Sequence, residues 1–457
     1  MQQRIFMKLR RFFTILITTA ILIGAFPASA LCDDNGALNL PDFPALVSRN
    51  IVLMDADSGE VLFGSNADLK CAPASTTKLM TALLTVENCA LTDKVVFSQN
   101  AVDSIEYGDA NASISAGEEL TVEQSLYCLI LRSANEVSYG LAEHMGKTLS
   151  AFASMMNSRA QELGATGTHF SNASGLTDEF HYTTPYDMAL IARACFNNKT
   201  LMRIISYSDL YTIGPTNKSN FTRYYRHRYQ MLPGGDYAYQ YSCGGKTGYT
   251  DAAGNCLVSF AQKDDLRLIC VVMNSTDSGR YTDTIALFDY YFNNYHKIYL
   301  EDYQTGITSG SIDILELINR IDSAADISIG FKSGAYLLVP NNVLMPQLTG
   351  IVTYSDNPAY SGETGGFACV SYFYQNINVG SATIFVTTRE AEGLLPGQNG
   401  VPSLSLKHPE PAENLRYINI WYILGSVLAL ALIAGLIILF LRHRRRRSSR
   451  TYKKLRF

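Results

Sequence analysis

Residues 71–84, "CAPASTTKLMTALL", decide how the rest of the sequence is interpreted. Ser75 and Lys78 are three residues apart, Pro73 precedes them, and the apolar residues that follow have helical spacing. Because Pro favours a helix start, we expect a helix over 75–88 with Ser75 and Lys78 on one face. The unpaired N–H groups of its first turn would stabilise negative charge on a serine oxygen. The pattern predicts a serine nucleophile, although a capping serine followed by a surface lysine is the alternative.

A lysine beside a nucleophile is useful only if it can lose its proton. The ordinary lysine pKa, about 10.4, leaves an ammonium near pH 7. Burial and a second cation both disfavour the charged form and therefore lower the pKa. A general base at Lys78 thus requires a buried position and another cation brought close by the fold.

A second motif, "SANE" at 133–136, lies in a break between helices expected at 121–132 and 136–147. The first of these helices opens with a capping box at Thr121. In an extended segment residues i and i+2 point to one side, so the Ser133 hydroxyl and the Asn135 amide can face a shared cleft. A hydroxyl there could relay a proton and an amide could hold a peptide, but Ser and Asn are also ordinary turn residues.

The third motif is "CGGKTGYTDAAGNC" at 243–256. We expect Lys246 to end a strand over 239–247, next to glycines that let a substrate backbone approach closely. Lys246 and Thr247 offer a cation and a hydroxyl suited to a carboxylate. A phosphate-binding loop is excluded, since Gln240 stands where G-x-x-x-x-G-K-T requires glycine.

S-x-x-K, S-x-N and K-T-G in this order, each in its matching context, resemble the penicillin-binding proteins. Within them the chain resembles the D-alanyl-D-alanine carboxypeptidase family of serine peptidases, also in "GLTDEFHYTTPYDMALIAR" (175–193) and "GGKTGYTDAAGNCLVS". The resemblance covers roughly residues 46–296. It implies an α+β fold of the β-lactamase and penicillin-binding transpeptidase type.

The resemblance also implies roles. Ser75 would be the acylated nucleophile, Lys78 its general base and Ser133 the proton relay. The substrate-binding residues would be Asn135, Lys246, Thr247, Gly248 and Tyr249, and the backbone N–H groups of Ser75 and Tyr249 would form an oxyanion hole. The implied reaction removes the terminal D-alanine from peptidoglycan stem peptides ending in D-Ala-D-Ala, with β-lactams as covalent inhibitors and no cofactor or metal.

Two positions depart from the family pattern. Gly245 precedes Lys246 where an apolar residue is common, and Glu136 follows Asn135 where aspartate is common. Neither departure removes a catalytic group. His181 and Asp187, in "HYTTPYD", are interpreted as structural.

The order of the predicted elements indicates α+β with helices on an antiparallel sheet. A hairpin is expected around Asp57-Ser58-Gly59, further helices at 150–163 and 281–295, and strands at 255–262 and 266–274. Four apolar segments, "GAYLLVP", "LTGIVTY", "FACVSYFY" and "SATIFVTT", predict a β-rich region. The expected parts are a signal peptide (1–30), the catalytic domain (31–300), a β-rich accessory domain (301–395), a linker (396–419), a transmembrane helix (420–441) and a basic cytoplasmic tail (442–457).

The two ends predict an exported, single-pass protein. A basic segment, an apolar run and "ASA" form the pattern of a cleaved signal peptide within 1–30. Residues 420–441 carry no charge and as a helix would span about 33 Å, enough to cross a bilayer. The tail holds nine Lys/Arg and no acid, so the positive-inside rule places it in the cytoplasm and the catalytic domain on the extracytoplasmic face of a bacterial cell membrane.

The net charge and the spacing of the cysteines argue against several classes of function. Between the two basic ends 24 Lys/Arg face 41 Asp/Glu, a net charge of −17, which makes a nucleic-acid partner a poor match. Nine cysteines occur without a C-x-x-C or H-E-x-x-H pattern, so no zinc or thioredoxin-like site is indicated. We expect free thiols, with one disulfide among Cys243, Cys256 and Cys270 left open.

Two other functions are considered. A class A β-lactamase shares the three motifs but uses a glutamate in E-x-x-L-N, a pattern that none of the glutamates between Ser133 and Lys246 begins. A non-catalytic penicillin or peptidoglycan sensor would signal through a tail of only sixteen residues. Endopeptidase activity on cross-links would use the same residues as carboxypeptidase activity, so the sequence does not separate the two.

Overall fold

The computed structural model describes residues 41–300, 327–355, 362, 365–375 and 377–388. The expected signal peptide, linker, transmembrane helix and basic tail lie outside the described residues. Within the described ranges, no helix combines the length and apolar character needed to cross a membrane.

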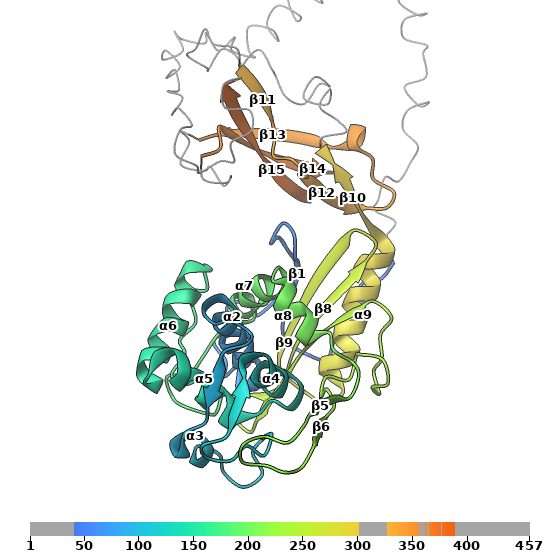
Figure 1. Cartoon of the computed structure of the whole chain (residues 1–457). Helices are drawn as coiled ribbons and strands as arrows, with labels where there is room; N and C mark the ends of the chain where they lie inside the picture. Colours follow the sequence, from blue (N-terminus) through green and yellow to red (C-terminus); the bar gives the residue numbers. More distant parts are fainter. Residues whose placement is uncertain (1–40, 301–326, 356–361, 363–364, 376, 389–457) are drawn as a thin grey trace, which may run out of the picture. The chain divides into compact units, whose positions relative to one another are not determined.

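A five-stranded antiparallel sheet organises the catalytic part (Figure 1). Its order is β2-β1-β9-β8-β7, so the early hairpin pairs with the late meander. The strands are β1 (Asn50–Asp55), β2 (Val61–Ser65), β7 (Ser242–Thr250), β8 (Gly254–Lys263) and β9 (Leu266–Ser275). The expectation of an α+β fold built on an antiparallel sheet is confirmed.

Both faces of this sheet are buried, which explains its continuous apolar strands. Along β1, Ile51 and Leu53 belong to one core cluster and Val52 and Met54 to the other, as the two-residue period of a strand requires. Helix α9 (Gly279–Asn294) packs on the face that carries Ile51 and Leu53. The remaining helices gather on the opposite side of the sheet (Figure 1).

Most of these helices begin at a polar side chain that accepts a backbone hydrogen bond. The capping box expected at Thr121 is present at the start of α4, and Thr184 caps α7 by accepting a hydrogen bond from the Asp187 N–H. The helices of this layer are α2 (Lys78–Asn88), α3 (Gln99–Asp103), α4 (Val122–Tyr127), α5 (Asn135–Gly146), α6 (Leu149–Glu162), α7 (Pro185–Phe196) and α8 (Lys199–Ile205). Two short hairpins complete it: β3 (Lys94–Val96) with β4 (Glu119–Thr121), and β5 (Tyr211–Ile213) with β6 (Arg223–Tyr225).

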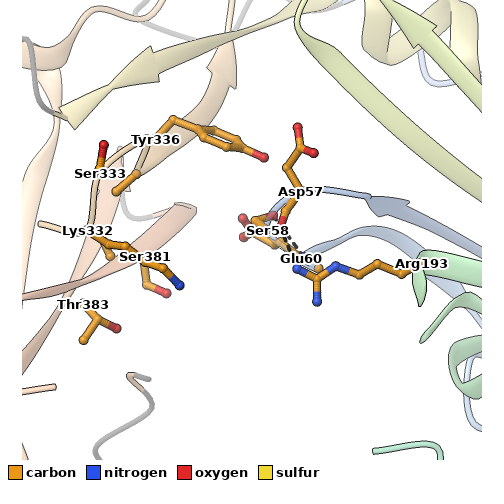
Figure 2. Close-up of a pocket in the computed structure, with 13 residues that line it drawn as sticks. Asp57, Ser58, Glu60, Arg193, Lys332, Ser333, Tyr336, Ser381 and Thr383 are labelled. Carbon is orange, nitrogen blue, oxygen red and sulfur yellow. Dashed lines mark hydrogen bonds between the residues drawn. The ribbon is translucent and has the colours of Figure 1, made fainter. Parts of the chain in front are cut away.

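One arginine ties this layer to the β1–β2 turn. Arg193 of α7 donates to the carbonyl oxygen of Ala56 at 2.8 Å. It also donates to the carbonyl oxygen of Asp57 at 2.6 Å (Figure 2). Gly59 has φ +80°, and a Cβ there would lie 2.9 Å from the Arg193 guanidinium. Glycine is therefore required in this turn for both its backbone conformation and its lack of bulk.

Three element bounds differ from expectation at the motifs. Ser75 lies in a short 3₁₀ helix, η2 (Ala74–Thr77), and α2 begins only at Lys78. The expected helix 121–132 ends at Tyr127 and continues as a π-helix, η3 (Cys128–Arg132). The expected strand 239–247 is shifted to Ser242–Thr250, because Tyr239 takes part in turn hydrogen bonds instead of the ladder. Lys246 is therefore in mid-strand.

The C-terminal part contains the expected strands. Strand β10 (Tyr295–Tyr299) pairs with β12 (Tyr336–Pro340). A second sheet has the order β11-β15-β14-β13, with β11 (Ile327–Phe331), β13 (Thr349–Tyr354), β14 (Ala368–Tyr374) and β15 (Ile377–Thr388). The division into domains at residue 300 stays a prediction, since residues 301–326 lie outside the described part.

Seven cysteines are free thiols: Cys71, Cys89, Cys128, Cys195, Cys243, Cys256 and Cys270. Cys256 and Cys270 are buried and Cys243 is partly buried. The disulfide left open among these three is therefore not formed in this structure.

Candidate active site

Ser75 is held by an unusual backbone arrangement. The residue before it, Ala74, has φ +48°, in the left-handed region that non-glycine residues rarely adopt. Gly175, at φ +86°, lies so close that a Cβ there would be 1.8 Å from the Ala74 carbonyl oxygen. The fold thus fixes the serine by packing one constrained backbone segment against another.

Lys78 is fully buried directly behind Ser75. Its Nζ donates to Ser75 Oγ at 3.0 Å, to Asn135 Oδ1 at 2.7 Å and to the Ser174 carbonyl oxygen at 2.6 Å. Burial lowers the pKa of Lys78 to about 7, against the opposing attraction of Glu136 and Asp109. A substantial fraction of this side chain is therefore an amine near neutral pH and can accept the Ser75 proton.

Ser133 and Lys246 form a second hydroxyl–amine pair. Ser133 ends the π-helix in the left-handed region, at φ +59°, and accepts a hydrogen bond from Lys246 Nζ at 2.9 Å. Lys246 also donates to the Thr247 carbonyl oxygen at 2.8 Å. Burial, followed by repulsion from Lys78, holds the pKa of Lys246 well below its ordinary value. The positive charge that lowers the pKa of Lys78 comes from Arg228, and its effect is smaller than that of burial.

Strand β7 runs directly beside the nucleophile's turn. A Cβ on Gly248 would lie 3.1 Å from the Ser75 backbone nitrogen, so glycine permits the close approach. Tyr249 follows it, with a side chain that is 60% exposed and a hydroxyl bonded to Asp251 at 2.9 Å. Tyr249 therefore lies at the rim of the cleft, with much of its side chain in solvent.

The departure at Gly245 has a packing reason. A Cβ at this position would lie 2.2 Å from the Val258 carbonyl oxygen and 2.4 Å from the ring of Tyr229. Tyr229 is almost fully buried and occupies this space. Its ring therefore fills the volume that an apolar side chain at position 245 would need.

Most of the predicted catalytic and substrate-binding residues line one cleft. Six of them line it, namely Ser75, Ser133, Asn135, Thr247, Gly248 and Tyr249. Lys78 and Lys246 are hydrogen-bonded to the two lining hydroxyls. Three sequence motifs, which are spread along the chain from Ser75 to Tyr249, thus meet at one site.

Sequence reasoning missed two cations of this cleft. Arg228 and Arg280 both line it, and each lowers the pKa of Lys246. Arg280 donates to the Gly248 carbonyl oxygen at 3.3 Å. Neither residue belongs to a recognisable motif, and only the tertiary fold brings the segment before β7 and the start of α9 to the cleft.

His181 supports the nucleophile's turn from behind. Its Nδ1 accepts the Ser171 N–H at 3.0 Å, so the proton lies on Nε2, which donates to Thr77 Oγ1 at 2.8 Å. Burial lowers the pKa of His181 to about 4, so the ring is neutral. Asp187 accepts a hydrogen bond from Thr168 at 2.7 Å in the neighbouring network. These contacts agree with a structural interpretation of both residues.

Metal coordination finds no support in the described ranges, where His, Cys, Asp and Glu form no group of three or more able to hold a metal ion.

The sheet, its helical layer and the Ser–Lys pairs define a serine peptidase of the penicillin-binding class. A D-alanyl-D-alanine carboxypeptidase family model, peptidase family S11, matches residues 39–277, more than half of the sequence. The chain therefore belongs to the D-alanyl-D-alanine carboxypeptidase family of serine peptidases.

Named relatives agree with this assignment. The D-alanyl-D-alanine carboxypeptidase DacF of Bacillus subtilis is 32% identical over 63% of this chain and 72% of its own length. DacA of Escherichia coli, which carries the same description, is 29% identical over 62% of this chain and 70% of its own.

Solved structures agree as well. The Streptomyces K15 DD-transpeptidase is 27% identical, with a TM-score of 0.51 over 55% of this chain and all of that protein. The D-alanyl-D-alanine carboxypeptidase DacD of Francisella tularensis has a TM-score of 0.59 over 79% of this chain at 23% identity, a likeness of fold.

Proposed function

We propose that this protein is a serine D-Ala-D-Ala carboxypeptidase that removes the terminal D-alanine from peptidoglycan stem peptides. The observation that carries the proposal is the buried Lys78 amine, 3.0 Å from Ser75 Oγ, with its pKa lowered to about 7. Membership of the carboxypeptidase family supports the choice of substrate.

Acylation begins with proton transfer from Ser75 Oγ to Lys78 Nζ. The oxygen then attacks the carbonyl carbon between the two D-alanines and forms a C–O bond. Negative charge develops on the carbonyl oxygen, where the backbone N–H groups of Ser75 and Tyr249 would donate hydrogen bonds. Because η2 and β7 are packed closely at Gly248, these donors need little reorganisation.

Collapse of this intermediate breaks the C–N bond and releases D-alanine. The proton that Lys78 took from Ser75 passes through the Ser133 hydroxyl to the leaving amine, so Lys78 is again a neutral amine. Lys246 Nζ donates a hydrogen bond to that hydroxyl. Water then attacks the acyl-enzyme, gives a proton to Lys78 and releases the shortened peptide, which restores the Ser75 hydroxyl.

Substrate binding would use the opposite charges of substrate and cleft. The free carboxylate of the terminal D-alanine would face Thr247 and the cations Lys246, Arg228 and Arg280. The Asn135 amide would hold the peptide backbone. A β-lactam carries an equivalent carboxylate beside its reactive carbonyl and would acylate Ser75.

Location forms a separate part of the proposal. The sequence patterns at 1–30 and 420–441 support export followed by anchoring in the cell membrane through one helix. Fractionation of cells that produce the full chain should recover it with membranes, and external protease should digest the catalytic part. Recovery in the soluble cytoplasmic fraction would contradict this part of the proposal.

The decisive experiment measures D-alanine release from a pentapeptide ending in D-Ala-D-Ala. The protein should release free D-alanine and bind a fluorescent penicillin covalently, whereas the Ser75→Ala variant should do neither. Well-folded protein that releases no D-alanine would contradict the proposal. Rapid turnover of penicillin without a lasting adduct would indicate a β-lactamase, and release from cross-linked muropeptides would add endopeptidase activity.

A further inference from the structure

Glu136 is a buried carboxylate that the mechanism above does not use. Its side chain has no exposed surface and lies in the first turn of α5, directly after Asn135. Oε1 accepts the backbone N–H groups of Ala112 and Ile114, at 2.7 and 3.5 Å. Oε2 is buried without any hydrogen-bond partner. Since an unpartnered buried oxygen is costly, this glutamate calls for an explanation beyond helix formation.

The segment that Glu136 holds forms a wall of the cleft. Asp109 and Ala110 line the cleft, and the Asn135 N–H donates to the Ala110 carbonyl oxygen at 2.8 Å. Consecutive residues of α5 therefore bind the same segment, with Asn135 facing the cleft and Glu136 behind the wall. The position of this wall relative to Asn135 depends on both contacts.

Glu136 also acts on Lys78 through its charge, because the preceding residue, Asn135, accepts a hydrogen bond from Lys78 Nζ at 2.7 Å. Burial raises the pKa of Glu136, while the N–H groups of Ala112 and Ile114 and the charge of Lys78 favour its carboxylate form. Attraction to Glu136 is the largest influence that favours the Lys78 ammonium, followed by attraction to Asp109. Repulsion from Arg228 disfavours the ammonium form of Lys78. Lys246 and His181 also interact electrostatically with Lys78. On its other sides Glu136 interacts with the titratable Cys128 and Tyr225.

We infer that Glu136 is a positioning residue of the acylation site. It anchors the Asp109–Ile114 wall to helix α5, and its negative charge governs how readily Lys78 gives up its proton. The inference rests on the proposed acylation of Ser75. The larger side chain, compared with the aspartate common in the family, reaches the wall from a fully buried position.

The charge effect is tested with Glu136→Gln, which keeps an acceptor for the Ala112 N–H. Removing the negative charge disfavours the ammonium, so the acid limb of the pH profile for penicillin acylation should move down by about one pH unit. If that limb lies near pH 7, acylation at pH 6 should become about fivefold faster while the rate at pH 9 stays within about twofold. A residue with only a structural role would lower the rate at every pH without moving the limb.

The anchoring effect is tested with Glu136→Asp, which keeps the charge but shortens the side chain by one methylene. It should lower the acylation rate about tenfold at all pH values and leave the acid limb in place. Glu143→Gln, which removes the same charge further along α5, is the matched control and should change neither quantity. Thermal unfolding of each variant verifies that folded proteins are compared.

The outcomes separate this inference from the proposed function. If wild-type protein is not acylated at all, the proposed function fails. If it is acylated but the limb moves by less than about 0.2 pH unit in Glu136→Gln, or equally in Glu143→Gln, the inference is overturned. Should Glu136→Gln not fold, Glu136→Asp decides the anchoring role, and an unchanged rate in that variant overturns the inference.

Discussion

The cleft end of the central sheet and its α9 face differ in the polarity of the side chains that they bury. At the cleft, polar side chains such as Lys78, Asn135, Glu136 and Lys246 are buried, and Ala74 and Ser133 have left-handed backbone angles. Against α9 the buried set is almost entirely apolar, with Leu257, Leu268, Val272, Leu287 and Phe288 in contact across the interface. Several buried charged side chains and two strained residues thus gather at the cleft, whereas Asp283 is the buried charged residue of α9.

The cleft and the α9 face contribute differently to chemistry and to stability. Burial of apolar side chains on α9 favours folding. Each strained residue opposes folding by about 1–3 kcal/mol, and each buried charge opposes it unless it is paired and hydrogen-bonded. We therefore expect substitutions at the cleft to change chemistry more than stability, and substitutions against α9 to do the reverse.

The largest effect is expected from Lys78→Met, which removes the base while filling similar space. Penicillin acylation should become about 10³-fold slower, because no other group accepts the Ser75 proton. Stopped-flow measurement with a fluorescent penicillin tests this. Lys199→Met, at an exposed position on α8, is the control and should leave the rate unchanged. A loss of less than tenfold in Lys78→Met would remove Lys78 from the role of base.

Leu287→Ala on the α9 face should lower stability and leave the chemistry almost unchanged. Leu287 has no exposed surface, so the cavity should lower the free energy of unfolding by about 2–5 kcal/mol. The acylation rate of the folded fraction should stay within about twofold. Urea unfolding measures the first quantity, and Leu210→Ala, at an exposed leucine, should show little change. Equal losses of stability in both variants would contradict the assignment of this face.

His181 predicts an acid-dependent loss of stability at the cleft. Its pKa is about 4 in the folded protein and about 6.5 when unfolded, so the unfolded state binds the proton first as the pH falls. The free energy of unfolding should drop by about 3 kcal/mol between pH 6.5 and 4 on this account. Unfolding curves of His181→Gln should show a weaker pH dependence over this window, unlike those of His169→Gln at an exposed histidine. An unchanged slope in His181→Gln would contradict the prediction.

Gly175→Ala should give a smaller effect on chemistry. Its Cβ would overlap the Ala74 carbonyl oxygen, so the turn that carries Ser75 must move, and we expect acylation to slow about tenfold. Gly164→Ala is a matched control, since Gly164 has a similar φ of +81° but its nearest neighbour would be a leucine methyl at 3.7 Å. If both variants slow acylation equally, backbone strain alone explains the effect.

The sequence predicts the three motifs and the α+β class because both depend on local patterns. Short apolar runs bounded by turn residues predict the strands, and the capping box at Thr121 marks a helix start that the structure confirms. The residues of the motifs are also those that the structure gathers at the cleft, while their roles stay proposals.

What the sequence does not predict arises from contacts between distant segments. Ser75 is in a 3₁₀ turn because Gly175 constrains the backbone before it, a contact across a hundred residues. Arg228 and Arg280 reach the cleft only through the arrangement of β7 and α9. Glu136 is one position beyond a motif, and nothing local indicates that its carboxylate binds Ala112 and Ile114.

The π-helix before Ser133 has a consequence for how this chain can change. A π-turn holds one residue more than the α-turn it replaces, which is the geometry that a single-residue insertion leaves behind. Deleting one residue from Cys128–Arg132 would allow a regular helix to form, but each residue of an α-helix advances by about 100°. The Ser133 hydroxyl would then rotate away from Lys246, so a change of length in this short irregular turn would break the hydrogen bond between the two residues.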